Sequence, residues 1–207
     1  MGLSLPYEHL NLRHNPFGEM DPGRRADLAV VDIDEIVSQL RSPRFAVQFL
    51  GDCGRGKTTH LLAIRASFAR APYMHIAEGQ RVRELPEARA GVPIFLDELQ
   101  RLPRNLRRKL PAGKNPLAVG THKDLQRALV RAGYEVRTVR PAGLLDAARI
   151  KRIFERRIEH ARRSPGALPA IRGETIADLL RRYGSNVRGM EHEMYERFQE
   201  LQRICDV

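Results

Sequence analysis

The stretch from Gly51 to Thr58 constrains this chain most, because it fits the phosphate-binding pattern G-x-x-x-x-G-K-[ST] at every fixed position. The apolar run 45–50 precedes it and predicts a buried strand. Residues 57–68 follow without proline or glycine and are compatible with a helix. Strand, glycine loop and helix therefore occur in the order in which backbone N–H groups and a helix N-terminus bind a polyphosphate.

The loop predicts a nucleotide site with Mg²⁺. Lys57 is expected to reach the β- and γ-phosphates, and the hydroxyl of Thr58 to hold Mg²⁺. The alternative, a chance glycine-rich turn, is disfavoured by the flanking strand and helix. The residues expected to surround the phosphates are Gly51, Asp52, Cys53, Gly54, Arg55, Gly56, Lys57, Thr58 and Thr59.

A second motif, this one acidic, lies 40 residues after Lys57, where the apolar run 92–96 is followed by Asp97 and Glu98. A buried parallel strand would deliver Asp97 to its carboxyl end, beside the phosphate loop. Asp97 is expected to bind Mg²⁺ through water, and Glu98 to polarise the attacking water. A strand ending in Asp-Glu means little alone, but at this distance from a full phosphate loop it is a strong signal.

Net charge points to an anionic partner. The chain has 207 residues, of which 42% are hydrophobic and 29% charged, as in a folded globular protein. Its formal charge of +11 favours nucleic acid, with double-stranded DNA the expected partner. The alternatives are a plain basic surface and an arginine content set by genome base composition.

Cysteine usage and hydropathy bear on the compartment. Cys53 and Cys205 are the only cysteines, and they form no C-x-x-C, so neither a disulfide framework nor a thiolate zinc site is indicated. No apolar stretch approaches the ~20 residues of a membrane span, and the N-terminus lacks the layout of a signal peptide. A cytoplasmic protein without membrane insertion is expected.

The order of elements predicts an α/β fold. Strands alternate with helices up to about residue 143, which indicates a parallel sheet with crossovers, and the pattern beyond is only helical. The expected organisation is an N-terminal arm at 1–27, an α/β nucleotide-binding core at 28–143 and a helical lid at 144–207. The expected strands are 45–50, 73–77, 92–97, 117–121 and 136–139.

Residues 101–114 form a basic segment in which Leu102, Leu106 and Leu110 share one helical face. The basic residues would then crowd the opposite face, where they could contact DNA phosphates or the nucleotide of a neighbouring subunit. The alternative is a solvated face. The basic side chains are Arg101, Arg104, Arg107, Arg108, Lys109 and Lys114, and the candidates for DNA contact among them are Arg104, Arg107, Arg108 and Lys109.

Two further residues are candidates for sensing the nucleotide. Thr121 ends an expected strand and could orient the attacking water, although a threonine there is commonly only a cap. Arg188 lies in the first turn of the last expected helix, where the helix dipole disfavours a cation. The γ-phosphate of a nucleotide would relieve that unfavourable position.

Taken together, these motifs resemble the AAA+ ATPases over about residues 28–205. Gly51–Thr58 resembles Walker A, Ile94–Glu98 resembles Walker B, Thr121 falls at sensor 1, and Gly184–Arg188 resembles sensor 2. The resemblance implies an Mg²⁺-dependent ATP hydrolase with a five-stranded parallel sheet ordered 5-1-4-3-2 and a small helical lid. It also implies that ATP binds between core and lid, with Thr121 and Arg188 at its γ-phosphate.

Two short segments narrow the resemblance. Leu12–Phe17 and Asp97–Leu102 are similar to the "PF" and "DEAQ-x-L" segments of the ExeA and TniB/TnsC group, which includes ATPases that assist DNA transposition and ATPases of secretion systems. That group implies a homo-oligomer in which each subunit lends an arginine finger to its neighbour. The segment around Arg131 departs from the group's Gln-Arg-hydrophobic pattern, and Arg131 is the candidate finger. His122, directly after Thr121, is also unusual for the group.

Three functions follow from these features. The first is an ATPase regulator that assembles on DNA and serves a transposase-like or other protein partner. The alternative is a protein-directed ATP switch or loader in which DNA plays no part. The third, a non-catalytic nucleotide-binding scaffold, conflicts with the intact set of Lys57, Thr58, Asp97 and Glu98.

Overall fold

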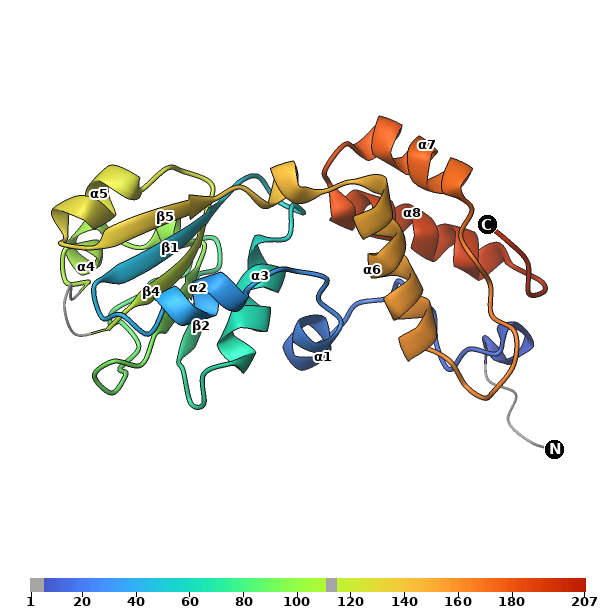
Figure 1. Cartoon of the computed structure of the whole chain (residues 1–207), viewed down its shortest axis with the longest axis horizontal. Helices are drawn as coiled ribbons and strands as arrows, with labels where there is room; N and C mark the ends of the chain where they lie inside the picture. Colours follow the sequence, from blue (N-terminus) through green and yellow to red (C-terminus); the bar gives the residue numbers. More distant parts are fainter. Residues whose placement is uncertain (1–5, 111–114) are drawn as a thin grey trace. The chain divides into compact units, whose positions relative to one another are not determined.

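A computed structural model describes residues 6–110 and 115–207 of the chain (Figure 1). The chain divides into two compact units, one made of Met1–Arg24 with Gly143–Val207 and the other of Arg25–Ala142. The N-terminal residues therefore group with the C-terminal helices, and helix α1 (Pro22–Asp27) spans the boundary in the sequence. Among the described residues, no helix has both the length and the apolarity to cross a bilayer.

The unit Arg25–Ala142 is built on five parallel strands in the order β2-β3-β4-β1-β5. This is the strand order expected from the resemblance, and the α/β fold class is confirmed. Parallel pairing places the carboxyl ends of β1, β3 and β4 at one edge of the sheet, where α/β proteins bind ligands. The strands are β1 (Phe45–Leu50), β2 (Tyr73–His75), β3 (Ile94–Asp97), β4 (Leu117–Thr121) and β5 (Glu135–Val139).

Both faces of this sheet are covered, because successive side chains of each strand point to opposite sides. Phe95 belongs to the cluster that contains the apolar residues of α2 and α3. Its neighbour Leu96 belongs to the cluster on the other face, with leucines of η2, α4 and α5. The helical elements are α2 (Asp34–Gln39), α3 (Lys57–Ala66), η2 (Leu99–Arg101), α4 (Arg104–Arg107), α5 (Gln126–Arg131) and η3 (Pro141–Leu144).

The described part of the basic segment is less helical than the spacing of its leucines predicts. Its helix α4 covers only Arg104–Arg107 and begins directly after Pro103. Proline lacks the N–H that a continuing helix needs, so the chain turns there and restarts. Leu102, Leu106 and Leu110 are nevertheless all buried in one cluster, as their spacing predicts. The part of the expected segment that contains Lys114 lies outside the described residues.

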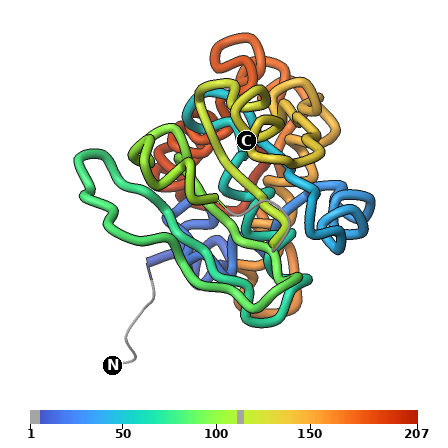
Figure 2. The backbone as a smooth tube through the Cα atoms, turned by 90° about the vertical axis from the view of Figure 1, so that its left-hand side faces the viewer, coloured from blue at the N-terminus to red at the C-terminus, as the bar shows by residue number. Residues whose placement is uncertain are grey.

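A long loop joins β2 to β3 and extends beside the sheet in teal and green (Figure 2). It contains no helix or strand between His75 and Ile94, in agreement with the polar, proline-containing sequence. Val82 and Leu85 pack against the cluster that holds Leu106 of α4. The loop is therefore attached to the same face of the sheet as the basic segment.

The other unit is helical, with α6 (Ala147–His160), α7 (Gly173–Tyr183) and α8 (Val187–Glu200), preceded in the chain by η1 (Glu8–Leu10). Asp146 caps α6 by accepting a hydrogen bond from the Arg149 N–H at 2.7 Å. Phe17 reaches the core of this unit, with ring centroids 5.1 Å from Phe154 and 5.0 Å from Phe198. The N-terminal segment thus contributes to the hydrophobic core of the helices.

Candidate nucleotide-binding site

The phosphate loop has the backbone shape that its glycines permit. Gly54 and Gly56 have φ values of +76° and +82°, in the left-handed region that residues with a Cβ rarely adopt. Gly56 is the N-cap of α3, so the first helical turn begins at Lys57. The unpaired N–H groups of that turn and the helix dipole favour an anion at this point.

Lys57 is buried, with 5% of its surface exposed, and joins the loop to the acidic strand. Its Nζ donates a hydrogen bond to the Asp52 carbonyl at 2.9 Å. The same Nζ lies 3.9 Å from Oε1 of Glu98 and 3.4 Å from Nε2 of His122. The ammonium therefore contacts both the phosphate loop and the glutamate that follows β3.

Thr58 and Asp97 meet directly. The Thr58 hydroxyl donates to Oδ2 of Asp97 at 2.7 Å, which joins the first turn of α3 to the end of β3. A hydroxyl and a carboxylate are oxygen ligands of the kind that Mg²⁺ uses together with water and substrate phosphates. The donor set expected from the sequence is therefore assembled and fits this metal.

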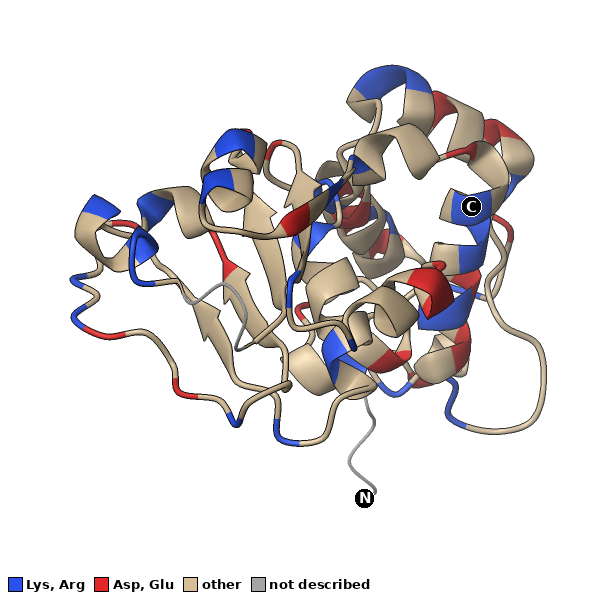
Figure 3. Ribbon diagram, turned by 60° about the vertical axis from the view of Figure 1, so that its left-hand side comes forward, with Lys and Arg blue, Asp and Glu red and all other residues tan. Residues whose placement is uncertain are grey.

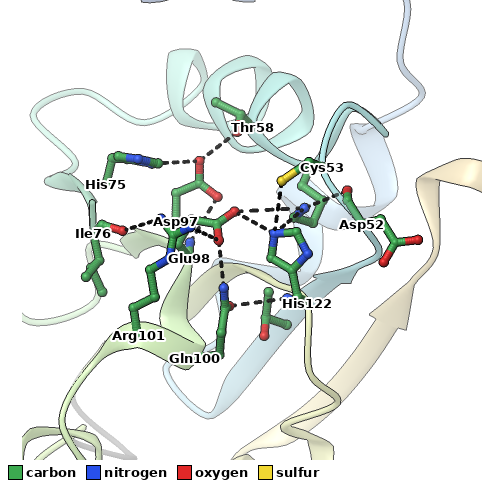
Figure 4. A network of polar contacts seen from close by, with 12 residues as sticks. Asp52, Cys53, Thr58, His75, Ile76, Asp97, Glu98, Gln100, Arg101 and His122 are labelled. Carbon is green, nitrogen blue, oxygen red and sulfur yellow. Dashed lines mark hydrogen bonds and ion pairs between the residues drawn. The ribbon is translucent and has the colours of Figure 1, made fainter. Parts of the chain in front are cut away.

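Two side chains of β2 also face Asp97. The Tyr73 hydroxyl donates to Oδ2 of Asp97 at 3.1 Å. Nδ1 of His75 lies 3.4 Å from the same oxygen (Figure 4). Burial, and then the neighbouring charge of Asp97, raise the pKa of Tyr73 well above its usual value of 10. The phenol therefore keeps its proton and acts as the donor.

Glu98 is held by several groups at once. Its Oε2 accepts a hydrogen bond from Nε2 of Gln100 at 2.6 Å and lies 3.7 Å from the guanidinium of Arg101, while its Oε1 lies 3.1 Å from Nε2 of His122. The residue is buried and has φ +64°, an uncommon left-handed backbone. Such strain concentrates at functional sites and costs on the order of 1–3 kcal/mol.

The polar contacts at the end of β4 involve both Thr121 and the residue after it. The buried Thr121 hydroxyl donates to the Lys123 carbonyl at 2.8 Å and accepts from the Lys123 N–H at 3.1 Å, which closes a turn. The ring of His122 instead contacts Glu98 and Lys57, and the backbone N–H of His122 donates to Oε1 of Gln100 at 3.2 Å. The sequence assigns no role to His122, and its only signal is its unusual position after Thr121.

Two of the candidate arginines are exposed. Arg188 lies in the first turn of α8, whose N-cap Asn186 accepts a hydrogen bond from the Gly189 N–H at 3.1 Å. Arg131 lies in the last turn of α5. Within the described parts of the chain, neither guanidinium forms an ion pair with a carboxylate. Their roles at the nucleotide stay predictions.

The basic segment presents unpaired charge. Arg104, Arg108 and Lys109 are exposed and Arg107 is half-buried. Across residues 6–110 and 115–207, none of these four forms an ion pair. Arg101 differs, because it lies within ion-pair distance of both Glu78 and Glu98 and donates to the Ile76 carbonyl at 3.0 Å.

Several arginines of the helical unit are neutralised, and both basic and acidic residues lie along its helices (Figure 3). Arg182 and Arg197 share Glu193, and Arg162 pairs with Glu159. This unit therefore offers less free positive charge than its composition indicates.

Comparisons with known proteins support the fold. No protein-family model matches the sequence, and no curated protein matches it. A single-substitution variant of RuvB from Thermotoga maritima matches with a TM-score of 0.58 and 15% identity, over 84% of this chain and 64% of that one. The Thermotoga maritima RuvB Holliday junction branch migration motor matches with a TM-score of 0.56 and 17% identity, over 90% of this chain and 65% of that one. NtrX from Brucella abortus matches with a TM-score of 0.53 and 14% identity, over 88% of this chain and 52% of that one.

The chain has the fold of these RuvB and NtrX structures, and its strand order is the one expected from the resemblance to the AAA+ ATPases. The chain spans less than two thirds of the length of these structures. At this level of identity the comparisons show the fold, and the grouping with ExeA and TniB/TnsC stays a prediction.

Proposed function

We propose that this chain binds and hydrolyses ATP with Mg²⁺ and acts as a DNA-associated ATPase regulator in the cytoplasm. One observation carries the ATPase part: the phosphate loop and the acidic strand end meet through polar contacts. Thr58 lies 2.7 Å from Asp97, and Lys57 lies 3.9 Å from Glu98. Burying charged groups together costs free energy, and such clusters are typical of functional sites rather than of residues with a structural role only.

Each side chain has a distinct task in this proposal. Lys57 binds the β- and γ-phosphates through its ammonium, which already lies at the loop carbonyl of Asp52. Mg²⁺, held by Thr58 and Asp97, would supply charge neutralisation at the phosphates. Glu98 polarises the attacking water, and its buried position favours a fixed orientation.

The remaining contacts to the γ-phosphate come from residues outside the loop and strand. Thr121 and Arg188 serve as sensors, and Arg131 is the finger that a neighbouring subunit supplies in a homo-oligomer. The exposed positions of Arg188 and Arg131, each without an ion pair among the described residues, support roles toward an anion.

The DNA part of the proposal rests on the basic segment. Arg104, Arg108 and Lys109 are exposed and without ion pairs in the described chain, so their charge is available to phosphates. RuvB, a structural neighbour, is a Holliday junction branch migration motor. A transposase-like protein partner would fit the resemblance to the TniB/TnsC group. The two free cysteines fit a reducing compartment.

The test is ATP hydrolysis at low salt, measured with and without duplex DNA. We expect DNA to stimulate the wild-type rate, and a triple variant with alanine at Arg104, Arg108 and Lys109 to lose the stimulation. A control with alanine at Arg13, Arg152 and Arg203 removes the same charge from exposed positions of the other unit and should retain it.

The salt dependence gives a second measure of DNA binding. The triple variant should reduce the slope of log affinity against log salt concentration by about 0.9 for each DNA phosphate that it no longer neutralises. Turnover that is indifferent to DNA would instead support the protein-directed switch.

A further inference from the structure

The carboxylate of Asp97 is enclosed on all sides. None of its surface is exposed, and both oxygens accept hydrogen bonds within the chain. Oδ2 accepts from the hydroxyls of Thr58 and Tyr73, at 2.7 Å and 3.1 Å. Oδ1 accepts from the Glu98 N–H at 3.1 Å. A buried carboxylate needs such partners, and here they fix its orientation as well as its charge.

Sheet register explains how these groups meet. His75 of β2 is the parallel partner of Asp97 in β3, and Tyr73 is two residues earlier on β2. Because side chains alternate between the two faces, Tyr73, His75 and Asp97 all point to the side of the sheet that α3 covers. The hydroxyl of Tyr73 therefore reaches Asp97 from the edge side of the sheet, while Thr58 reaches it from the helix.

Gly120 of β4 supplies the space on the opposite side. A Cβ at this position would lie 2.3 Å from Oδ1 of Asp97 and 3.1 Å from Cδ1 of Leu61. The first distance is far below any van der Waals contact, so only glycine leaves room for this carboxylate. Asp97 is thus limited sterically by β4 and hydrogen-bonded from β2.

We propose that Tyr73 is a positioning residue that, with the space left at Gly120, holds the carboxylate of Asp97 in the orientation that meets Thr58. The inference rests on the proposed ATPase function, because Asp97 acts there as a ligand of Mg²⁺. Hydrogen bonds that orient a ligating carboxylate typically change metal affinity by about 10–100-fold. His75 contributes less, since its ring lies 3.4 Å away and its side chain is half exposed.

The test compares Tyr73→Phe with the wild-type protein by titrating a fluorescent ATP analogue in EDTA and then in rising Mg²⁺. We expect the affinity of Tyr73→Phe for the analogue in EDTA to stay within about twofold of the wild-type value. The Mg²⁺ concentration that gives half of the maximal Mg²⁺-dependent change in binding should rise about tenfold. Gly120→Ala, which displaces the same carboxylate, should show the same rise.

Tyr134→Phe is the matched control. It removes another buried phenol of the same unit, one that donates to the Asn115 carbonyl at 3.3 Å and does not contact Asp97. Its Mg²⁺ requirement should equal that of the wild type. A Tyr73→Phe variant with an unchanged Mg²⁺ requirement would overturn the positioning role, even if the variant is less stable.

A second measurement needs no nucleotide. Tyr73→Phe should raise the unfolding equilibrium constant roughly tenfold in the wild-type background and less than about twofold in an Asp97→Ala background. Equal effects in both backgrounds would overturn the Tyr73–Asp97 link. If the wild-type protein binds the analogue equally with and without Mg²⁺, the proposed function itself is contradicted. The comparison of Tyr73→Phe in the wild-type and Asp97→Ala backgrounds would still test the contact between Tyr73 and Asp97.

Discussion

Nε2 of His122 lies 3.1 Å from Oε1 of Glu98, so the residue after β4 reaches the glutamate after β3. The same nitrogen lies 3.4 Å from Nζ of Lys57. The imidazole therefore contacts both the lysine of the phosphate loop and the glutamate that we propose as the group acting on water. With its proton on Nε2, the ring donates to Glu98 and, together with Gln100, limits the orientations of that carboxylate.

We expect His122→Ala to lower kcat for ATP hydrolysis about tenfold, with little change in KM. Removing a hydrogen bond to a charged group commonly costs about 1.5–3 kcal/mol, and here the loss falls on the position of Glu98. Steady-state kinetics measure the split. His192→Ala, an exposed histidine on α8, is the control. Unchanged kcat in His122→Ala would show that the contact has no part in turnover.

Gly56→Ala should weaken nucleotide binding and lower the free energy of unfolding by about 1–2 kcal/mol. The reason is the φ of +82°, which places a Cβ in the disfavoured left-handed region. Urea unfolding measures the stability. Gly173→Ala is the control, because an added Cβ there meets nothing within 4 Å and the residue lies at the start of α7. Equal stability of the two variants would contradict the argument from backbone strain.

Arg157→Ala should lower the free energy of unfolding by about 3 kcal/mol. Its buried guanidinium donates to the carbonyls of Pro16 at 2.8 Å and Gly18 at 2.7 Å, and pairs with Glu191. The variant leaves these acceptors without a donor, so the N-terminal segment should also become sensitive to limited proteolysis. Arg152→Ala, exposed on the same helix, should change stability by less than about 0.5 kcal/mol.

Acid should weaken the helical unit through Glu193. Burial opposes ionisation of this carboxyl, but hydrogen bonds from Arg182, Arg197 and Tyr183 outweigh it and lower its pKa to about 2, from an ordinary 4.5. Between these values the unfolded chain binds more protons, so the stabilisation is present above pH 4.5 and is lost as the pH falls toward 2.

Urea unfolding at pH 7, 4 and 3 measures this effect. The stability difference between wild type and Glu193→Gln should shrink as the pH falls. Glu200→Gln, exposed at the end of α8, is the control. A difference that stays constant from pH 7 to 3 would rule out the linkage.

Local sequence patterns were sufficient for most of the fold. The phosphate loop was recognisable because its glycines and Lys57 have a fixed spacing, and the strand ending at Asp97 because it is apolar and ends in two acids. The strand order came from resemblance, since spacing does not determine which parallel strands are neighbours. Among the described residues, helix α4 is shorter than the spacing of Leu102, Leu106 and Leu110 predicts, and it begins only after Pro103.

The polar contacts around the site could not be predicted from the sequence. Tyr73 and Asp97 are 24 positions apart, and only the register of β2 against β3 brings them together. Arg157 looks like one of several surface arginines of α6, yet it is buried because the N-terminal segment covers it. Such long-range polar contacts leave no periodic signal in a single sequence.

The most direct measurement of the central claim compares ATP binding and ATP turnover in wild type and Glu98→Gln with Mg²⁺. We expect both proteins to bind ATP with similar affinity, and Glu98→Gln to lose hydrolysis by at least about 100-fold, since only the group acting on water is changed. Equal turnover in the two proteins, or no ATP binding by the wild type, would contradict the proposed role of Glu98.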